Sequence, residues 1–213
     1  MIHDYDRSHW FGASDSKYIM GMNNMSKTWL DWWDVKCGIT EQNFHGSIYT
    51  KAGNTFEHSI LRAWNPHITF DRQIVVPELR LRVNLDGNTA DEIFEVKTYQ
   101  IGKEFKVTDA YYYQAQLQML AWKLEPSIRW VECEGQPELK GKNQPLHRHT
   151  ILAYGLYPDE YYSEYTAEQI ENGEIPIDKD RILEFPIKPS QGTIRRARKN
   201  LKKLAKRLRK DEI

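Results

Sequence analysis

The sequence predicts an α/β (α+β) fold built as a single domain across residues 1–213. Three β-like runs follow one another in the middle of the chain, at about 68–76, 79–86 and 90–99. Apolar residues recur at helical spacing on either side of these runs, at 50–64 and at about 108–123. A chain of 213 residues can build one substantial core, and no repeat or linker divides it.

Capping residues place two further helices near the N-terminus. The first covers residues 12–20 and has Ser14 as its N-cap, because a serine side chain can accept a hydrogen bond from the free N–H groups of a first turn. The second starts near Ser26 or Thr28 and runs to Gly38, since glycine commonly follows the end of a helix.

The second half of the chain is expected to add strands, a loop and one long helix. Strands are predicted at 128–134 and 147–156, with a polar Gly/Pro-rich loop at 135–145 between them. Residues 181–187 fit an edge strand, because Pro186 cannot donate a hydrogen bond to a central ladder. The last helix, at about 190–210, has apolar residues along one side and basic residues elsewhere.

Charge is distributed unevenly along the chain, although the net charge is zero. Residues 195–210 carry ten Lys or Arg and no acid, so the rest of the chain has a balance of −10. A basic arm of this kind often contacts nucleic acid, and the alternative is a helix face that is only solvated.

The composition is that of a globular protein. Hydrophobic residues make up 40% of the chain and aromatic residues 12%, which excludes an intrinsically disordered chain. No apolar run approaches the length of a membrane span, and the polar N-terminus does not resemble a secretory signal. Cys37 and Cys133 lack metal-type spacing, so we expect a reduced, cytoplasmic protein.

Residues 79–99, LRLRVNLDGNTADEIFEVKTY, contain the strongest functional signal. Asp86 ends one β-like run, and Glu95 and Lys97 share one face of the next, because alternate strand residues point the same way. A turn near Gly87–Asn88 would place Asp86 beside Glu95. Paired carboxylates are typical ligands of Mg²⁺, and a nearby lysine can orient or deprotonate water or neutralise charge. The pattern predicts a metal-dependent phosphodiesterase; the alternative, in a chain with 28% charged residues, is a solvated strand edge.

Three further features lie before or after Asp86, Glu95 and Lys97 in the sequence. Glu57 lies on the helix before the strands, and Gln114 and Gln116 lie on the helix after them. Near the N-terminus, Arg7 and Ser14 are residue types that bind phosphate, the first by its fork of donors and the second at a helix start. Each feature alone has a plain structural explanation, as an exposed helical glutamate, surface glutamines or an N-cap.

Together the motifs resemble those of the lambda exonuclease and YqaJ viral recombinase group, within the PD-(D/E)XK nuclease superfamily, over about residues 7–122. RSHWFGASDSKYIMG resembles the family's Arg-spacer-Gly-x-(Ser/Thr)-x-Ser start, AGNTFEHSI its Gly-x-x-x-Glu helix, and NLDG its Asp-Gly strand end. EVK matches Glu-x-Lys, and YYYQAQLQM matches Tyr-x-x-Gln-x-Gln. The family usually has Pro where this chain has Leu85, the gap from Lys97 to Gln114 is short, and no family motif follows residue 125.

The resemblance implies a restriction-endonuclease-like PD-(D/E)XK core, with a mixed central β-sheet flanked by helices. It also implies a Mg²⁺-dependent exonuclease, with Mn²⁺ as a substitute, that digests linear double-stranded DNA in the 5′→3′ direction and leaves 3′ single strands for phage-type recombination. A single-strand annealing protein is the expected partner, a trimer the expected homo-oligomer, and the host cytoplasm the expected location if a phage encodes the protein.

The resemblance assigns a role to each motif residue. The metal would be held by Asp86, Glu95, the carbonyl of Val96 and Glu57. Lys97 and Gln114 would act on the attacking water or the scissile phosphate. The DNA and its 5′-phosphate would be bound by Arg7, Ser14, Tyr111 and Gln116.

Two other functions stay open from the sequence. One is a DNA-binding module with a nuclease fold and no activity, against which the intact Asp86, Glu95 and Lys97 argue. The other is a PD-(D/E)XK endonuclease, such as a restriction enzyme or a junction resolvase. The pair of Arg7 and Ser14 favours an enzyme that binds DNA ends over this second alternative.

Overall fold

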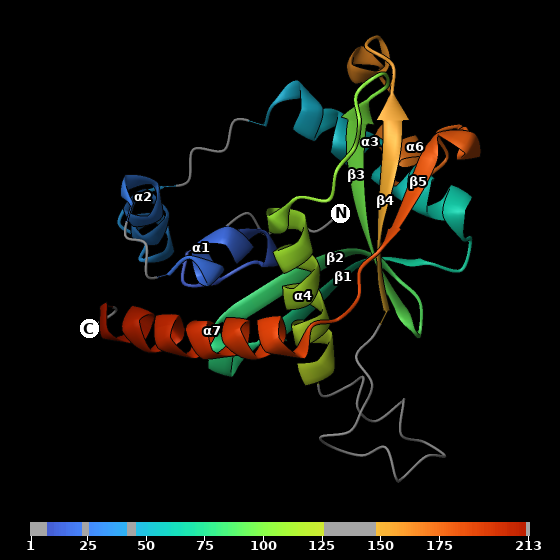
Figure 1. The fold of residues 1–213 in the computed structure, drawn as a ribbon. Coiled ribbons are helices and arrows are strands. Elements are labelled where there is room, and N and C mark those ends of the chain that lie inside the picture. Colours follow the sequence, from blue (N-terminus) through green and yellow to red (C-terminus); the bar gives the residue numbers. More distant parts are fainter. Residues whose placement is uncertain (1–7, 23–25, 42–45, 126–147, 212–213) are drawn as a thin grey trace, which may run out of the picture.

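The computed structural model describes residues 8–22, 26–41, 46–125 and 148–211 (Figure 1). The predicted strand at 128–134, the predicted loop at 135–145, Arg7 and Cys133 lie outside these residues. Within the described part of the chain, no helix is long and apolar enough to cross a membrane.

A five-stranded mixed sheet forms the centre of the fold. Across the sheet, the strands are β1 (Thr69–Val76), β2 (Leu81–Asn88), β3 (Glu92–Gln100), β4 (Arg148–Leu156) and β5 (Ile182–Pro186). β3 and β4 are parallel, and the other neighbouring pairs are antiparallel. The predicted fold class is confirmed, and β5 is an edge strand, where proline is tolerated.

Helices cover both faces of the sheet (Figure 1). The longer ones are α2 (Lys27–Lys36), α3 (Ile48–Trp64), α4 (Asp109–Leu124) and α7 (Gln191–Asp211). The short ones are α1 (Ser16–Met20) and α6 (Ala167–Glu171), with the 3₁₀ helices η1 (Ala13–Asp15), η2 (Pro77–Leu79), η4 (Glu160–Tyr162) and η5 (Lys179–Arg181). α2 begins after Ser26, as predicted, because the Ser26 side chain accepts a hydrogen bond from the N–H of Trp29.

Alternate residues of β3 divide the interior into two apolar clusters. Ile93 belongs to the cluster that includes α4 and α7, whereas Phe94 and Val96 pack with residues of α3. Glu95 and Lys97 therefore share the α4 side of the strand, as predicted, and Val96 points into the core on the other side.

The turn between β2 and β3 lies at residues 89–91, whereas the sequence predicted it near Gly87–Asn88. Gly87 stays in the strand for a packing reason. A Cβ at this position would lie 2.7 Å from the side chain of Ile68 and 2.9 Å from that of Leu61. The glycine thus allows β2 to lie close against α3 and the segment that follows it.

The first helix starts differently from the prediction. Ser14 is an exposed residue inside η1 and is not an N-cap. The neighbouring Asp15 anchors this segment instead. Its carboxylate accepts hydrogen bonds from the N–H of Gly12 at 2.7 Å and from the indole N–H of Trp32 at 2.9 Å, and it pairs with Lys36 at 2.8 Å. These buried contacts fix the local backbone and leave Ser14 facing solvent.

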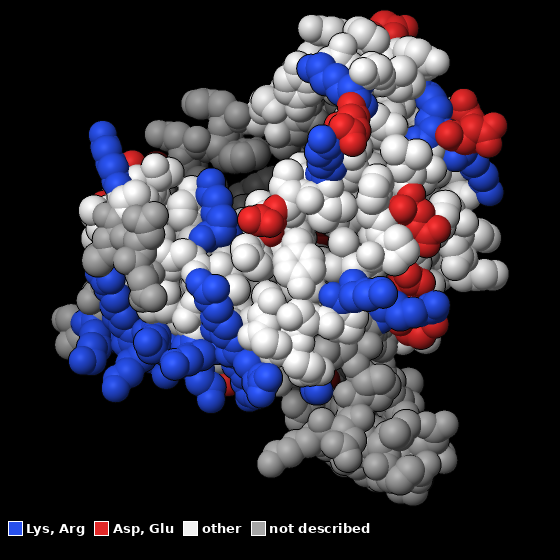
Figure 2. All heavy atoms as spheres, viewed as in Figure 1, with Lys and Arg blue, Asp and Glu red and all other residues white. Residues whose placement is uncertain are grey.

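α7 combines a buried apolar stripe with a basic surface. The stripe is the predicted one, and it consists of Ile194, Ala197, Leu201, Leu204 and Leu208. It packs in the same cluster as α1 and α4. The ten basic residues of the helix are all exposed, and Figure 2 shows lysine and arginine side chains gathered along it.

Candidate active site

The candidate site lies where β2 and β3 stop pairing. Past the ladder pair of Gly87 and Phe94, the Oδ2 atom of Asp86 accepts a hydrogen bond from the main-chain N–H of Val96 at 2.8 Å. A side chain therefore takes the place of a main-chain partner at this fork in the sheet. The bond brings the Asp86 carboxylate into the neighbourhood of Glu95, as the sequence predicted.

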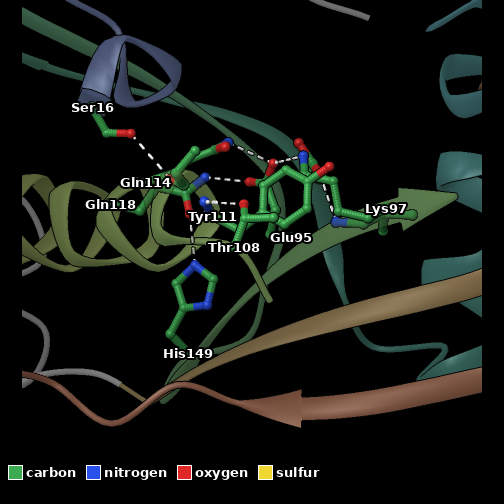
Figure 3. A network of polar contacts seen from close by, with 11 residues as sticks. Ser16, Glu95, Lys97, Thr108, Tyr111, Gln114, Gln118 and His149 are labelled. Atoms are coloured by element: carbon green, nitrogen blue, oxygen red, sulfur yellow. Dashed lines mark hydrogen bonds and ion pairs between the residues drawn. The ribbon is translucent and has the colours of Figure 1, made fainter. Parts of the chain in front are cut away.

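Glu95 is the centre of a buried network of polar side chains (Figure 3). Its Oε1 atom accepts hydrogen bonds from Lys97 Nζ and from Gln114 Nε2, the latter at 2.6 Å. Its Oε2 atom accepts one from Gln118 Nε2, and the Oε1 atom of Gln118 lies 2.6 Å from His149 Nε2. Only 4% of Glu95 is exposed. A carboxylate has about four acceptor positions, so three donors still leave room for a cation.

Gln118 and His149 were missed by the sequence analysis. Gln118 could have been found, because it follows Gln114 by four residues and so lies on the same face of α4. His149 could not, because it reaches the network through the pairing of β4 with β3, far away in sequence. Burial lowers the pKa of His149 to about 4, so its neutral imidazole donates the Nε2 proton to Gln118.

The carboxylates at the fork are close enough to repel one another. Burial raises the pKa of Asp86 to about 7, and the charge of Glu95 adds to this rise. Burial also raises the pKa of Glu57 on α3 well above its ordinary value, with further contributions from the charges of Asp86 and Glu95. The site thus holds more negative charge than its surroundings compensate.

Lys97 is the cation of this cluster. Burial alone would lower its pKa, but the charges of Glu95 and Asp86 and the hydrogen bond to Glu95 outweigh burial, and the pKa is raised. Lys97 is therefore a stable ammonium group in this arrangement. One ammonium does not balance the carboxylates of Asp86, Glu95 and Glu57.

This donor set fits a hard divalent cation. Carboxylate and carbonyl oxygens are the preferred ligands of Mg²⁺ and suit Mn²⁺ as well. A divalent ion would also remove the repulsion that raises the pKa values of Asp86 and Glu57. The residues that could hold it are those predicted, namely Asp86, Glu95, Glu57 and the carbonyl of Val96.

Two predicted DNA-binding residues lie around the N-terminal end of α4. Tyr111 is beside the network, with its ring centre 5.4 Å from Lys97 Nζ. Ser14 is exposed on η1, and the next segment is tied to α4 by a hydrogen bond of 3.1 Å from Ser16 Oγ to the carbonyl of Ala110 (Figure 3). Both residues stay candidates for contact with DNA.

Gln116 does not reach the site, although the sequence predicted that it binds DNA. It is completely buried, and its Nε2 atom donates to the carbonyl of Lys188 at 3.0 Å. Its Oε1 atom accepts a hydrogen bond from the N–H of Ser190 at 2.8 Å. Both ends of the amide are used to hold the segment before α7, so the predicted DNA contact is wrong and the residue has a structural role.

His58 and Asp71, which the sequence analysis also missed, lie beside Glu57. His58 Nε2 is 3.1 Å from Asp71 Oδ2, and the hydrogen bond with His58 lowers the pKa of Asp71 to about 2. Asp71 comes from β1, two strands away from Glu95, so no local spacing in the sequence pointed to it.

No protein-family description and no curated protein sequence matches the chain. Among solved structures, it is similar to an alkaline exonuclease from Laribacter hongkongensis, with a TM-score of 0.58, 15% identity, and coverage of 97% of this chain and 91% of that chain. The complex of that exonuclease with dAMP gives a TM-score of 0.59 at 14% identity and the same coverage. A phage-related exonuclease from Haemophilus somnus 129PT gives a TM-score of 0.57 at 16% identity, with 96% of each chain covered. The likeness shows that this chain has the fold of these exonucleases, as the motifs predicted.

Proposed function

We propose that this protein is a metal-dependent deoxyribonuclease that digests double-stranded DNA from its ends. The observation that carries the proposal is the convergence of Asp86, Glu95 and Glu57 at the β2–β3 fork, with the ammonium of Lys97 held against Glu95. The solved structures with the same fold are exonucleases by name, and one of them was solved with dAMP, a mononucleotide. Both points support a nuclease acting on DNA.

The metal would be held by the carboxylates of Asp86, Glu95 and Glu57 together with the carbonyl of Val96. When bound, Mg²⁺ supplies positive charge next to the scissile phosphate and makes the attacking water more acidic. Glu95 takes part with a fixed orientation, because neutral amide donors hold both of its oxygens.

Lys97 would neutralise charge and position water or phosphate. The sequence left open whether this lysine deprotonates the water, but a raised pKa keeps its proton in place in the metal-free site. Gln114 donates a hydrogen bond to Glu95 Oε1, the same atom that Lys97 contacts, so Gln114 can also reach the water or the phosphate. Tyr111, at the edge of the network, offers an aromatic face on which a base of the substrate could stack.

We further propose that digestion runs 5′→3′ and leaves 3′ single strands for recombination. The support is the N-terminal motif with Arg7 and Ser14, together with the exposure of Ser14 near the α4 end that carries Tyr111. A single-strand annealing protein would then receive the product. A homo-oligomer, trimeric by resemblance, would keep the enzyme on its substrate, and static light scattering of the purified chain measures this state.

The test is incubation with Mg²⁺ and either linear or covalently closed circular duplex DNA. Cutting of the linear duplex alone is expected. Cutting of both substrates would indicate an endonuclease, and cutting of neither would indicate a DNA-binding module. Linear duplexes labelled at the 5′ or the 3′ end then give the direction, since 5′→3′ digestion releases the 5′ label first.

A further inference from the structure

A histidine and two carboxylates lie together beside the proposed nuclease centre. Glu57, His58 and Asp71 each offer one ligand atom, and these atoms all lie within 4.8 Å of one another. We propose that they form a second metal site, which binds a first-row transition-metal dication such as Zn²⁺ or Mn²⁺. The site shares Glu57 with the proposed nuclease centre, but its binding of an ion does not depend on DNA cleavage.

The imidazole of His58 is oriented as in a metal-binding histidine. Its Nδ1 atom lies 3.0 Å from the carbonyl oxygen of Glu171. A carbonyl can only accept, so Nδ1 carries the proton and Nε2 is the atom that faces Asp71. Metal-ligating histidines usually donate their other N–H to a carbonyl or carboxylate in this way. The ring also stacks on Phe70, with ring centres 4.6 Å apart and planes 10° apart.

The turn after α6 holds the carbonyl group of Glu171 in place. Gly173 has a φ of 63°, and a Cβ there would lie 2.7 Å from the carbonyl oxygen of His58. Two residues later, the N–H of Ile175 donates to Ser59 Oγ at 3.0 Å. The α6 segment is therefore packed directly on the turn of α3 that carries His58, and it fixes the partner of Nδ1.

Asp71 occupies an unusual backbone conformation at the same place. It lies in β1 between the ladder residues Phe70 and Arg72, yet its φ of 56° is left-handed. Non-glycine residues rarely adopt this region, although Asp tolerates it better than most, and such residues cluster at functional sites. The conformation interrupts the ladder opposite Asp86 and accompanies the approach of Asp71 to His58.

The separation of the two ligand atoms suits a metal ion. Ligands of Zn²⁺ lie about 2.0–2.2 Å from the ion. Two such ligands in a tetrahedral site are about 3.4 Å apart, and His58 Nε2 and Asp71 Oδ2, 3.1 Å apart, need to separate only slightly to admit the ion. The imidazole also sets the selectivity, because imidazole nitrogen suits Zn²⁺, whereas Mg²⁺ and Mn²⁺ are suited by oxygen ligands, so Mn²⁺ would occupy this site only when supplied in excess.

A proton is the competing occupant of the space between these atoms. It would make His58 and Asp71 an ion pair and nothing more. The two alternatives differ in a spectroscopic property, because a Mn²⁺ ion bound to imidazole shows magnetic coupling to ¹⁴N. A Mn²⁺ ion held only by the oxygen ligands of the proposed nuclease centre does not show it.

The experiment is pulsed electron paramagnetic resonance of the full chain loaded with Mn²⁺ in excess over both sites, together with calorimetric titration with Zn²⁺. We expect ¹⁴N coupling in the parent and in Glu95→Gln, which damages only the nuclease centre. His58→Gln should abolish the coupling and weaken one Zn²⁺ binding event by about tenfold or more. His67→Gln, at an exposed histidine, is the matched control and should change neither measurement.

Asp71→Asn provides a second variant that keeps the imidazole, in case His58→Gln does not fold. It should also weaken Zn²⁺ binding by about tenfold or more. Absence of ¹⁴N coupling in the parent, or Zn²⁺ binding unchanged in both variants, would overturn the proposal in favour of the ion pair. A protein with ¹⁴N coupling that cuts no DNA contradicts only the proposed nuclease function, and a nuclease without the coupling contradicts only this site.

Discussion

Glu95 is held in one orientation before any cation or substrate is bound. Two of its three donors, Gln114 and Gln118, are neutral amides. They compensate part of the cost of burying the carboxylate, since a hydrogen bond to a charged group contributes about 1.5–3 kcal/mol. Because they add no positive charge, they leave the attraction of the carboxylate for a cation intact. Charged donors at these positions would have neutralised the site that they orient.

The role of Lys97 can be separated from that of the metal ligands. Lys97→Ala should reduce cleavage of linear duplex by about 100-fold or more, because it removes the ammonium next to the scissile phosphate. Affinity for Mg²⁺ should not fall, since the change removes a positive charge beside the carboxylates. Initial rates of digestion and calorimetric titration with Mg²⁺ measure the two effects.

Lys106→Ala is the control for this variant, because Lys106 is exposed and, among the described residues, pairs only with Glu104 on the surface. It should cut like the parent. Asp86→Ala should lose metal affinity as well as rate. A Lys97→Ala variant that cuts within a few-fold of the parent would show that the mechanism proposed for this lysine is wrong.

A preference for 5′-phosphate ends is expected if Arg7 and Ser14 bind the terminal phosphate. Such a phosphate carries more charge than an internal one, and one charge-assisted contact contributes about 1.5–3 kcal/mol, or roughly 10- to 150-fold in rate. Linear duplexes with 5′-phosphate and 5′-hydroxyl ends are compared. The parent should prefer the phosphate, and Arg7→Ala should lose most of this preference while Arg148→Ala keeps it. Equal rates on both ends for the parent would count against an end-binding enzyme.

At the scale of elements, local patterns were predictable and pairings between distant strands were not. Alternation in β3 placed Glu95 and Lys97 on one face, and the resemblance of the following helix to a family motif pointed to Gln114, which does contact Glu95. The turn was misplaced because Gly87 serves close packing on Leu61 and Ile68, and a glycine in a sequence does not reveal which use it has.

Residues that reach the site from β1 and β4 carried no signal in the sequence, because their positions depend on pairing between distant strands. Asp71 becomes a neighbour of Glu57 only when β1 lies beside β2, and His149 reaches Gln118 only when β4 lies beside β3. Gln116 shows the opposite error, a role that was predicted but is absent. Its helix was predicted correctly and its motif matched the family's, so the sequence indicated contact with DNA. Its partners just before α7 lie more than 70 residues away in sequence, so its burial could not be foreseen.

α7 should contribute affinity for DNA that depends on salt but not on sequence. Lys199, Lys202, Lys203 and Lys206 are exposed and make no ion pair within the described structure. Replacing all four by Gln should reduce the slope of log affinity against log salt by roughly 0.9 for each phosphate that the helix no longer neutralises. Fluorescence anisotropy with a labelled duplex measures the slope, and replacement of the same four by Arg, which keeps the charge, is the control. A slope unchanged by the Gln variant would indicate that α7 faces solvent or a second subunit.

At the scale of the whole molecule, negative and positive charge are concentrated in different places, the carboxylates at the buried β2–β3 fork and the exposed basic residues on α7. The chain outside residues 195–210 has a balance of −10, and the ten basic residues of α7 restore neutrality. If the chain binds DNA as proposed, the carboxylates at the β2–β3 fork would repel the DNA unless a cation is bound there, whereas α7 would attract it in either state. This separation would let the metal control cleavage more strongly than it controls binding. The fold class was predictable because it depends on the order of helices and strands, while this division depends on where they lie.

The uncompensated carboxylates should also make the stability of the metal-free protein fall as the pH rises. The pKa of Asp86 is about 7 in the folded protein against an ordinary value of 3.8, so the folded state binds this proton more tightly. The resulting stabilisation is complete below about pH 3.8 and is lost as the pH rises through about 7. Glu57, whose pKa is also raised, acts in the same direction. The melting temperature without metal should therefore be lower at pH 8 than at pH 6, by about 2–4 °C for each kcal/mol lost.

Added Mg²⁺ should restore the melting temperature at pH 8 and have less effect at pH 6, because it replaces the protons that the carboxylates have released. Differential scanning calorimetry at the two pH values, with EDTA or with Mg²⁺, measures both effects. Asp86→Asn is the informative variant, since an amide in place of the carboxylate removes the titrating group and one ligand together. It should melt with a smaller dependence on pH and respond weakly to Mg²⁺. A parent protein that melts at the same temperature in all four conditions would mean that the carboxylates at the fork neither repel one another nor hold a cation, and the metal-dependent function would lose its physical basis.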